Sequence, residues 1–356
     1  MIFSQIYILG MLFSLLSRLR PRLSFALCVI YTVLFCFVFI FRDPYYGAID
    51  IITYYKYYLD RNYWNISDPF LNNVYDLLNF VSKDYLIFSF YTTLSISVPL
   101  LFILSKIDKK SSMLMLFTLS VTTFYFIIQI NTYRYSLALI IIMSMFFYRG
   151  YIYYIFLILI SISIHKASLI YFLAILFIKS KSSKLLDCNV SVCFSLLFYI
   201  MSLTSGLDFS FYLLQLVSNI PIFTEKAQVG IGLLSDSIFS KPSIDHKSVL
   251  IPLAVVVLHL FDRGMINQNS HVLIIRRFLV LLMMLSPLFV GSALLFDRVY
   301  LLPNILSCFL IGYAMYNYAR INIFILYLMC LFLFSLVIIF IWGPRNFIGP
   351  YVSYLL

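Results

Sequence analysis

Long runs of apolar residues, separated by short polar stretches, repeat along the whole chain. Because about 20 apolar residues cross a bilayer as a helix, these runs predict an all-α, polytopic membrane protein with about twelve transmembrane or half-spanning helices. The runs do not break into the alternating strands of about ten residues that build a membrane β-barrel. The predicted segments cover roughly residues 2–17, 24–41, 85–105, 113–130, 136–148, 151–164, 167–178, 190–205, 248–261, 278–296, 299–317 and 321–342.

Four of these segments, the fifth, sixth, seventh and ninth, are short for a full crossing. Short apolar segments deep in a membrane protein are often broken helices that line a cavity. We therefore expect a single integral membrane domain, residues 1–356, in which half-helices surround a polar cavity.

Basic residues decide the predicted orientation. They gather after the first, third, fifth, seventh, ninth and eleventh segments, as Arg18, Arg20 and Arg22 do after the first. Lys and Arg favour cytoplasmic loops, so both termini and two long loops, 42–84 and 206–247, are predicted to face outward. One missed or additional segment would reverse the predicted orientation of part of the chain. The Arg276 and Arg277 pair is expected to lie beside a cytoplasmic loop that precedes the tenth segment.

The first long loop, 42–84, is predicted to hold an amphipathic helix on the membrane surface. Asp68 can cap a helix and Pro69 suits the first helical position. Apolar residues then recur at helical spacing up to Val81. The second loop, 206–247, contains the apolar stretch 209–223 and is predicted to be a partly inserted helix or a lid.

The amino-acid composition is typical of a membrane protein and excludes other classes of protein. The chain is 63% hydrophobic and only 11% charged, whereas soluble domains carry about 25% charged residues. The net charge of +11 comes from clusters between apolar runs, which is a topology signal and not a nucleic-acid-binding pattern. Six cysteines lie mostly inside apolar runs and fit small packing residues.

Charged side chains at the outer helix ends are the candidate chemistry. A charge in or beside the membrane must face a cavity or a partner. Four clusters lie on the predicted outer side. They are Arg42 with Asp43 and Asp50, Asn131-Thr132-Tyr133-Arg134, His165-Lys166, and Asp297-Arg298-Val299-Tyr300. Structural roles stay open for each, such as an interfacial Arg42, an ion-paired Asp297 or a structural His165.

The chemistry of these clusters favours an anionic ligand, because a planar guanidinium binds phosphate oxygens bidentately. The chain has a single glutamate, Glu225, no Asp-x-Asp pair and no Gly-rich phosphate loop. The sequence thus predicts a site without metal or cofactor for a phosphorylated, lipid-borne substrate.

At these clusters the chain resembles the Wzy-type and EpsG-like polysaccharide polymerases of bacterial inner membranes. Arg42, Gly47, Asp50 and Tyr54 are similar to the family's Arg…Gly-x-Asp-x-x-x-Tyr stretch, with one extra residue between glycine and aspartate. The segment from Asn131 to Ala138 is similar to Asn-x-x-Arg-Gln-x-Leu-Ala, with Tyr135 where glutamine is usual. The segments 165–170 and 298–300 are similar to its His-x-Ser-Ala-like and late Arg…Tyr elements.

The resemblance implies an all-helical fold of the kind found in lipid-using membrane glycosyltransferases (GT-C-like). It implies an O-antigen polymerase reaction at the periplasmic face of the inner membrane. There, a growing glycan is transferred from undecaprenyl pyrophosphate onto a lipid-linked repeat unit. Implied partners are the undecaprenyl-pyrophosphate-linked oligosaccharide, membrane lipid and a polysaccharide chain-length regulator.

Roles follow from this reaction. Arg134 and Arg298 are expected to stabilise the pyrophosphate leaving group, with Arg42 and Lys166 assisting. His165 or Asp50 is expected to be the base, and His165 is favoured because histidine ordinarily titrates near neutral pH. The remaining expected substrate-binding residues are Tyr54 and Tyr55, which can stack on sugars or form an interfacial tyrosine belt, Asn131 and Tyr300.

Two other functions compete. A flippase for lipid-linked oligosaccharide would more typically have two similar halves and polar residues through full-length helices. A membrane O-acyltransferase would carry an arginine and a histidine in its early helices, but no histidine precedes His165. A scaffold or small-molecule transporter is a third alternative.

Overall fold

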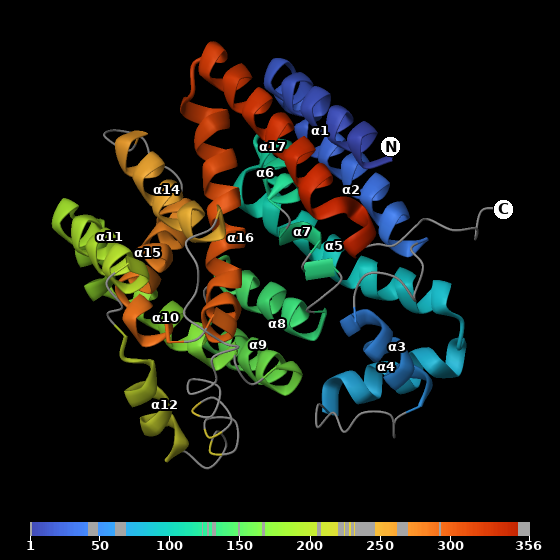
Figure 1. Ribbon diagram of the computed structural model, residues 1–356, viewed down its shortest axis with the longest axis horizontal. Coiled ribbons are helices and arrows are strands. Elements are labelled where there is room, and N and C mark those ends of the chain that lie inside the picture. Colours follow the sequence, from blue (N-terminus) through green and yellow to red (C-terminus); the bar gives the residue numbers. More distant parts are fainter. Residues whose placement is uncertain are drawn as a thin grey trace. The chain divides into compact units, whose positions relative to one another are not determined.

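The computed structural model describes residues 2–41, 49–60, 69–122, 124–126, 128–129, 133–148, 150–165, 168–204, 208–219, 224, 228, 231, 246–261, 270–291 and 293–347. Throughout these ranges the regular structure is helical, without strands, which confirms the all-α prediction. The α-helices, labelled in Figure 1 where there is room, are α1 (Ile2–Leu19), α2 (Ser24–Ile40), α3 (Ile49–Leu59), α4 (Pro69–Val81), α5 (Tyr85–Asp108), α6 (Ser112–Val121), α7 (Phe124–Phe126), α8 (Tyr133–Ser144), α9 (Tyr151–Ile164), α10 (Leu169–Lys179), α11 (Asn189–Thr204), α12 (Ser210–Ser218), α14 (His246–Phe261), α15 (Ser270–Met284), α16 (Ala293–Tyr318) and α17 (Ile321–Phe347). Short 3-10 helices are η1 (Pro21–Leu23), η5 (Lys181–Asp187) and η8 (Ser286–Leu288).

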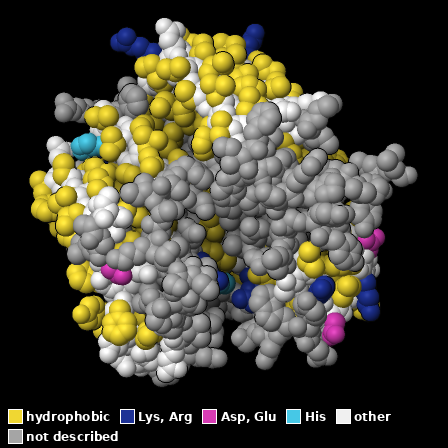
Figure 2. All heavy atoms as spheres, in the orientation of Figure 1, with side chains coloured by type: hydrophobic (Ala, Val, Ile, Leu, Met, Phe, Trp, Pro, Cys, Tyr) yellow, Lys and Arg dark blue, Asp and Glu magenta, His cyan; other side chains and the backbone are white. Residues whose placement is uncertain are grey.

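Length and composition support membrane insertion for several of these helices. Pro21–Ile40, Tyr85–Asp108 and Arg298–Tyr318 are each long and apolar enough to cross a membrane, and further apolar helices of 10–17 residues accompany them. Hydrophobic side chains cover much of the described surface in the view of Figure 2. The number of crossings and the GT-C-like likeness stay predictions.

Two predicted segments are not continuous helices. The fourth, 113–130, is divided, because α6 ends at Val121 and α7 is a separate short helix. The β-branched Val121 and Thr122 weaken the helix here, and the Thr122 hydroxyl bonds back to the Leu119 carbonyl, 3.0 Å away. The tenth, 278–296, is wrong as a unit, because α15 ends at Met284. Ser286 and Pro287 follow in η8, and a proline cannot continue the helical hydrogen bonds.

The chain divides into two compact units, Met1–Leu173 with Gly312–Leu356, and Ala174–Ile311. In the first unit α1 packs against α2, α6 and α17, and α2 packs against α5. Figure 1 shows α17 running beside α1. In the second unit α15 packs between α11 and α14, and η8 contacts α11 and α12.

One end of the first unit collects helix ends that the sequence places on the cytoplasmic side. The Arg18 guanidinium, at the end of α1, donates to the Ala319 carbonyl between α16 and α17 at 3.0 Å. The same cation lies 5.1 Å from the ring centroid of Tyr316. At the end of α5, Asp108 accepts a hydrogen bond from Asn317 at 3.3 Å. These contacts agree with the predicted grouping of the ends, and the compartment they face stays a prediction.

The helices α6 and α8 each have half the length of a membrane crossing. Ten residues in α6 and 12 in α8 span about 15 Å and 18 Å, against about 30 Å of hydrocarbon. The N-terminus of α6 lies at the end just described, because Met113 bonds Ser24 near the start of α2. The break after α6 therefore lies about 15 Å along that helix from this end of the first unit.

The two long loops contain helices. The predicted helix of the first loop is confirmed as α4, which begins at Pro69 and ends at Val81. The same loop contains α3, which the sequence analysis did not predict. In the second loop α12, Ser210–Ser218, lies within the predicted apolar stretch. Most of the rest of that loop falls outside the described residues, so the lid stays a prediction.

Close helix packing in the first unit depends on Gly312 of α16. A Cβ atom on Gly312 would lie 2.8 Å from the Met115 Cα of α6 and 3.0 Å from its backbone nitrogen. Backbone atoms cannot move aside as a flexible side chain can. The two helices approach this closely because residue 312 has no side chain.

We expect Gly312→Ala to lower the unfolding temperature of the purified protein, although alanine favours helix by about 1 kcal/mol. The clash with the α6 backbone should cost about 1–3 kcal/mol and exceed that gain. The matched control is Gly150→Ala, where the nearest contact of an added Cβ is the Tyr153 Cβ at 3.8 Å. Thermal unfolding in detergent measures both. An unfolding temperature raised by Gly312→Ala would contradict this packing.

Candidate active site

Arg134 lies in the first turn of α8, the half-length helix that begins at Tyr133. Its side chain is half-buried and its Nε atom is buried. The first four NH groups of a helix have no acceptor within the helix, and the helix dipole makes this end positive. A guanidinium at such an end gives two sources of attraction for an anion.

His165 is brought to the same place by the hairpin of α8 and α9. These two helices form a large contact in the first unit. Near the end of α9 the Ser161 hydroxyl donates to the Ala138 carbonyl, one turn into α8, at 3.2 Å. The start of α8 therefore lies beside the end of α9, where His165 follows in an extended backbone conformation.

Tyr135 connects the two candidates. Its ring centroid lies 4.7 Å from that of His165, with an angle of 49° between the rings. Its hydroxyl lies 2.7 Å from the Tyr171 hydroxyl of α10, and both tyrosines are buried. The imidazole is thus packed against the residue next to Arg134, and Tyr135 is itself held by α10. The sequence pattern alone predicts no role for Tyr135.

The helix α3, which begins within the first candidate stretch, also contacts the start of α8. Tyr54 is buried, and its ring lies edge-on to that of Tyr133 at 6.1 Å. Asp50 lies one turn earlier in the same helix. Tyr55 points elsewhere: its hydroxyl donates to the Lys83 carbonyl at 3.0 Å, and its ring contacts Tyr85. Tyr55 therefore joins α3 to the start of α5.

Other candidates fall outside what the structure describes. Arg42, Asn131 and Lys166 lie outside the described residues, as does the side chain of Asp50. Their predicted roles stay predictions.

The last cluster lies in the second unit. Arg298 is exposed on α16. Tyr300 is fully buried, its hydroxyl donates to the Leu282 carbonyl at 2.6 Å, and its ring stacks on Phe296 at 4.2 Å. These contacts make Tyr300 a core residue of the second unit.

A buried polar group beside the broken helix was missed by the sequence analysis. The Gln129 amide donates to the Ser97 hydroxyl at 2.8 Å, and the Tyr125 hydroxyl lies 3.3 Å from the same oxygen. The Tyr133 hydroxyl lies 3.0 Å from Ser95, half a turn away in α5. A glutamine within the apolar run 124–130 was the available signal. This group fixes the segment leading to Arg134 against α5.

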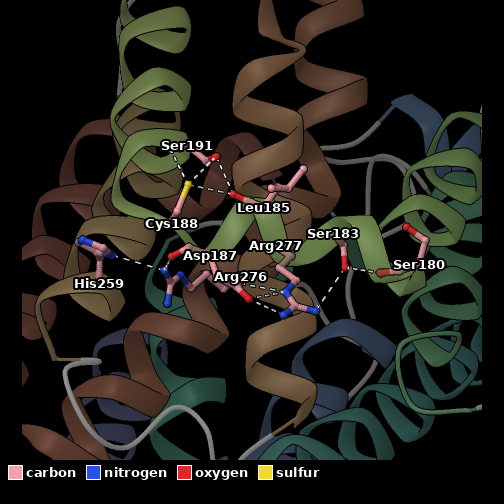
Figure 3. Close-up of polar contacts among 9 residues, drawn as sticks. All are labelled: Ser180, Ser183, Leu185, Asp187, Cys188, Ser191, His259, Arg276 and Arg277. Atoms are coloured by element: carbon pink, nitrogen blue, oxygen red, sulfur yellow. Dashed lines mark hydrogen bonds and ion pairs between the residues drawn. The ribbon is translucent and has the colours of Figure 1, made fainter.

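A second cluster of charges occurs in the second unit and forms a structural contact (Figure 3). Arg276 and Arg277 lie within α15, not beside a loop as predicted. Arg277 binds Asp187 through Nε at 2.9 and 3.1 Å and through a further contact from its terminal nitrogen. Buried Arg276 lies 3.4 Å from the His259 Nδ1 of α14. The fork-like pairing with Asp187 holds η5 against α15.

Metal-ligand groups are absent from the described parts of the chain, where no three His, Cys, Asp or Glu side chains gather closely enough to hold an ion.

Comparison with known proteins decides the family. The model of the EpsG family matches residues 25–353. The chain belongs to the EpsG family. The match confirms the resemblance to EpsG-like polysaccharide polymerases and spans every candidate site residue. No curated protein and no solved structure matches the chain.

Together with its apolar helices, EpsG membership identifies the chain as a membrane protein. Within it, Tyr54 contacts Tyr133 and His165 contacts Tyr135, the residues on either side of Arg134 in α8. These residues could be recognised in the sequence as similar to those of EpsG polymerases, because arginine and histidine are rare and costly in apolar surroundings.

The exposed thiol of Cys188, near the charge cluster of Figure 3, offers a test of orientation in this EpsG protein. Hydrogen bonding by the Ser191 hydroxyl, 3.1 Å away, and by the Ser191 NH lowers the pKa of Cys188. The thiolate fraction near neutral pH is therefore raised, and maleimide should react quickly. Ser191→Ala should slow the reaction at pH 7.

A membrane-impermeant maleimide should label Cys188 in inverted vesicles and not in intact cells, because the loop is predicted to be cytoplasmic. Cys188→Ser is the control that removes the part of the label carried by Cys188, because Cys193 and Cys330 are exposed as well. Rapid labelling of intact cells at Cys188 would reverse the predicted orientation of this loop.

Proposed function

We propose that this EpsG-family protein is a polysaccharide polymerase of the O-antigen type that acts at the outer face of the bacterial inner membrane. It transfers a growing glycan from undecaprenyl pyrophosphate onto a lipid-linked repeat unit. Family membership supports the class of reaction. The observation that carries the assignment to this site is the contact of His165 with Tyr135, which puts a potential base against the first turn of α8, the turn that also carries Arg134.

The transfer forms one bond to the anomeric carbon of the donor sugar and breaks another. The acceptor hydroxyl oxygen attacks the anomeric carbon of the donor sugar, and the bond from that carbon to the pyrophosphate oxygen breaks. Undecaprenyl pyrophosphate leaves with the electron pair. The acceptor's proton passes to a base. Because this leaving group is already stable as an anion, the main demand is for cations that stabilise its growing charge.

Arg134 meets that demand in the proposed site. Its guanidinium can bind two phosphate oxygens at once, and the positive end of the α8 helix dipole adds attraction for an anion. The low polarity of the surroundings strengthens both interactions relative to water. Arg42, Lys166 and Arg298 remain candidates for further positive charge at the diphosphate.

His165 is the favoured base, with Asp50 as the alternative. The packing of Tyr135 against the imidazole, and of Tyr171 against Tyr135, restricts where the His165 ring can lie. A base must be held within hydrogen-bond reach of the acceptor hydroxyl to be effective. Tyr54, edge-on to Tyr133, borders the same place and is a candidate sugar contact.

We expect Arg134→Gln to reduce polymerisation by about 10²–10³-fold, the usual effect of removing a donor that stabilises transition-state charge. Arg134→Lys should retain part of the activity, because lysine keeps the positive charge but lacks the planar guanidinium that binds two phosphate oxygens at once. The measurement is the length distribution of surface glycan on a gel, in cells that lack the native gene and carry each variant.

Arg320→Gln is the matched control, because Arg320 is exposed in the turn between α16 and α17, at the other end of the first unit. Single-repeat products should persist in the Arg134 variants, since the repeat unit still reaches the outer leaflet. Their disappearance would point to the flippase alternative. Wild-type chain lengths from Arg134→Gln, with the protein present in the membrane, would refute the assignment.

The identity of the base is tested by comparing His165→Asn with Asp50→Asn in membranes supplied with lipid-linked repeat units. Removal of a general base lowers kcat by about 10²–10⁴-fold. We expect that loss for His165→Asn, with little change in KM, and a smaller loss for Asp50→Asn. A larger loss of kcat for Asp50→Asn than for His165→Asn would assign the base to Asp50.

A further inference from the structure

The surface helix α4 presents apolar side chains on its outer side. Leu77 is 68% exposed, Phe80 91% and Val81 63%. Residues three and four apart lie on one side of a helix, so these three form one patch. A single exposed apolar residue is ordinary on any protein, whereas a contiguous group marks a surface that meets something apolar.

The opposite side of α4 is fixed to the first unit. Tyr75 is 1% exposed, and its ring meets that of Tyr58 in α3 at 5.8 Å. Asn79 donates to the Tyr58 carbonyl at 2.8 Å. The Tyr58 ring in turn lies 5.1 Å from Phe88 in α5. These contacts determine which side of α4 faces outward, so the exposure of Phe80 is a consequence of the fold.

The patch is next to the point where the chain enters the membrane. Three residues separate Val81 from Tyr85, the first residue of α5, and Asp84 caps α5 by accepting from the Leu86 NH at 2.9 Å. The 24 residues of α5 span about 36 Å, more than the hydrocarbon core of about 30 Å. The start of α5 therefore lies at headgroup level, within a few residues of the patch.

The patch also continues the apolar exterior of a membrane-crossing candidate. On α5, Phe90 is 45% exposed and Val98 58%, as expected for side chains that face lipid. Lys83 is exposed between the two helices, where its long stem can lie along apolar surface and its ammonium can reach lipid phosphates. Asp76 is exposed one turn before Phe80, so the apolar part is limited to the end of α4.

We propose that the last turn and a half of α4, residues 77–81, is inserted among the lipids of the leaflet that α5 enters at Tyr85. The partner is the acyl-chain and headgroup boundary of the bilayer, and α4 enters it at a tilt with its C-terminal end deepest. The α3–α4 pair is then a lipid-anchored element. This inference does not depend on the proposed function.

Photocrosslinking in native membranes tests the proposal. The photoreactive residue p-benzoylphenylalanine replaces Phe80 in the full chain, and Asp76 in the matched control. After irradiation, mass spectrometry identifies what is attached. We expect phospholipid adducts at position 80 that are several-fold more abundant than at position 76. Position 77 provides a second site if the protein with a replaced Phe80 does not accumulate.

Two results would overturn the proposal. The first is crosslinking of position 80 to a second copy of the chain or to another polypeptide, which would make the patch a protein interface. The second is an equal or absent lipid adduct at positions 80 and 76, which would place the patch in water.

Discussion

A helix that stops halfway through a bilayer leaves backbone NH groups that no water in the hydrocarbon can satisfy. The break between α6 and α8 imposes this constraint on the first unit. Side chains beside the break are paired within the protein, where Gln129 and Tyr125 bond to Ser97 in the middle of α5. At the start of α8 a charged residue, Arg134, occupies the first turn. An anion is the ligand that such an end attracts most strongly.

The rest of the candidate site follows from that broken helix. Because α8 is short, its hairpin with α9 returns the chain to the same depth and presents His165 beside Tyr135. The helix α3 adds Tyr54 against Tyr133. Ring contacts thus join α3 and the end of α9, which are far apart in sequence, to the first turn of α8. The charge cluster around Arg277 has another purpose, since its carboxylate partner is satisfied and it joins η5 to α15.

Much of this could be read from the sequence, and the reasons are physical. Charges at Arg134 and His165 stand out because apolar surroundings make them costly, and Pro69 marked the start of α4 because proline suits that position. Hydropathy could not reveal the break after Val121, since the residues on both sides are equally apolar. It also missed that Arg276 and Arg277 lie inside α15, where tertiary pairing with Asp187 offsets their cost. The burial of Tyr300 and the stacking of Tyr135 on His165 depend on side-chain packing that no local pattern encodes.

The most direct measurement is a cryo-electron microscopy structure of the protein in lipid nanodiscs with undecaprenyl pyrophosphate bound. The account predicts density for the diphosphate at the N-terminus of α8, with its oxygens within about 4 Å of the Arg134 guanidinium nitrogens, the distance of an ion pair. His165 should lie on the side from which a sugar hydroxyl approaches. A diphosphate bound elsewhere, out of contact with both Arg134 and the first turn of α8, would contradict the account.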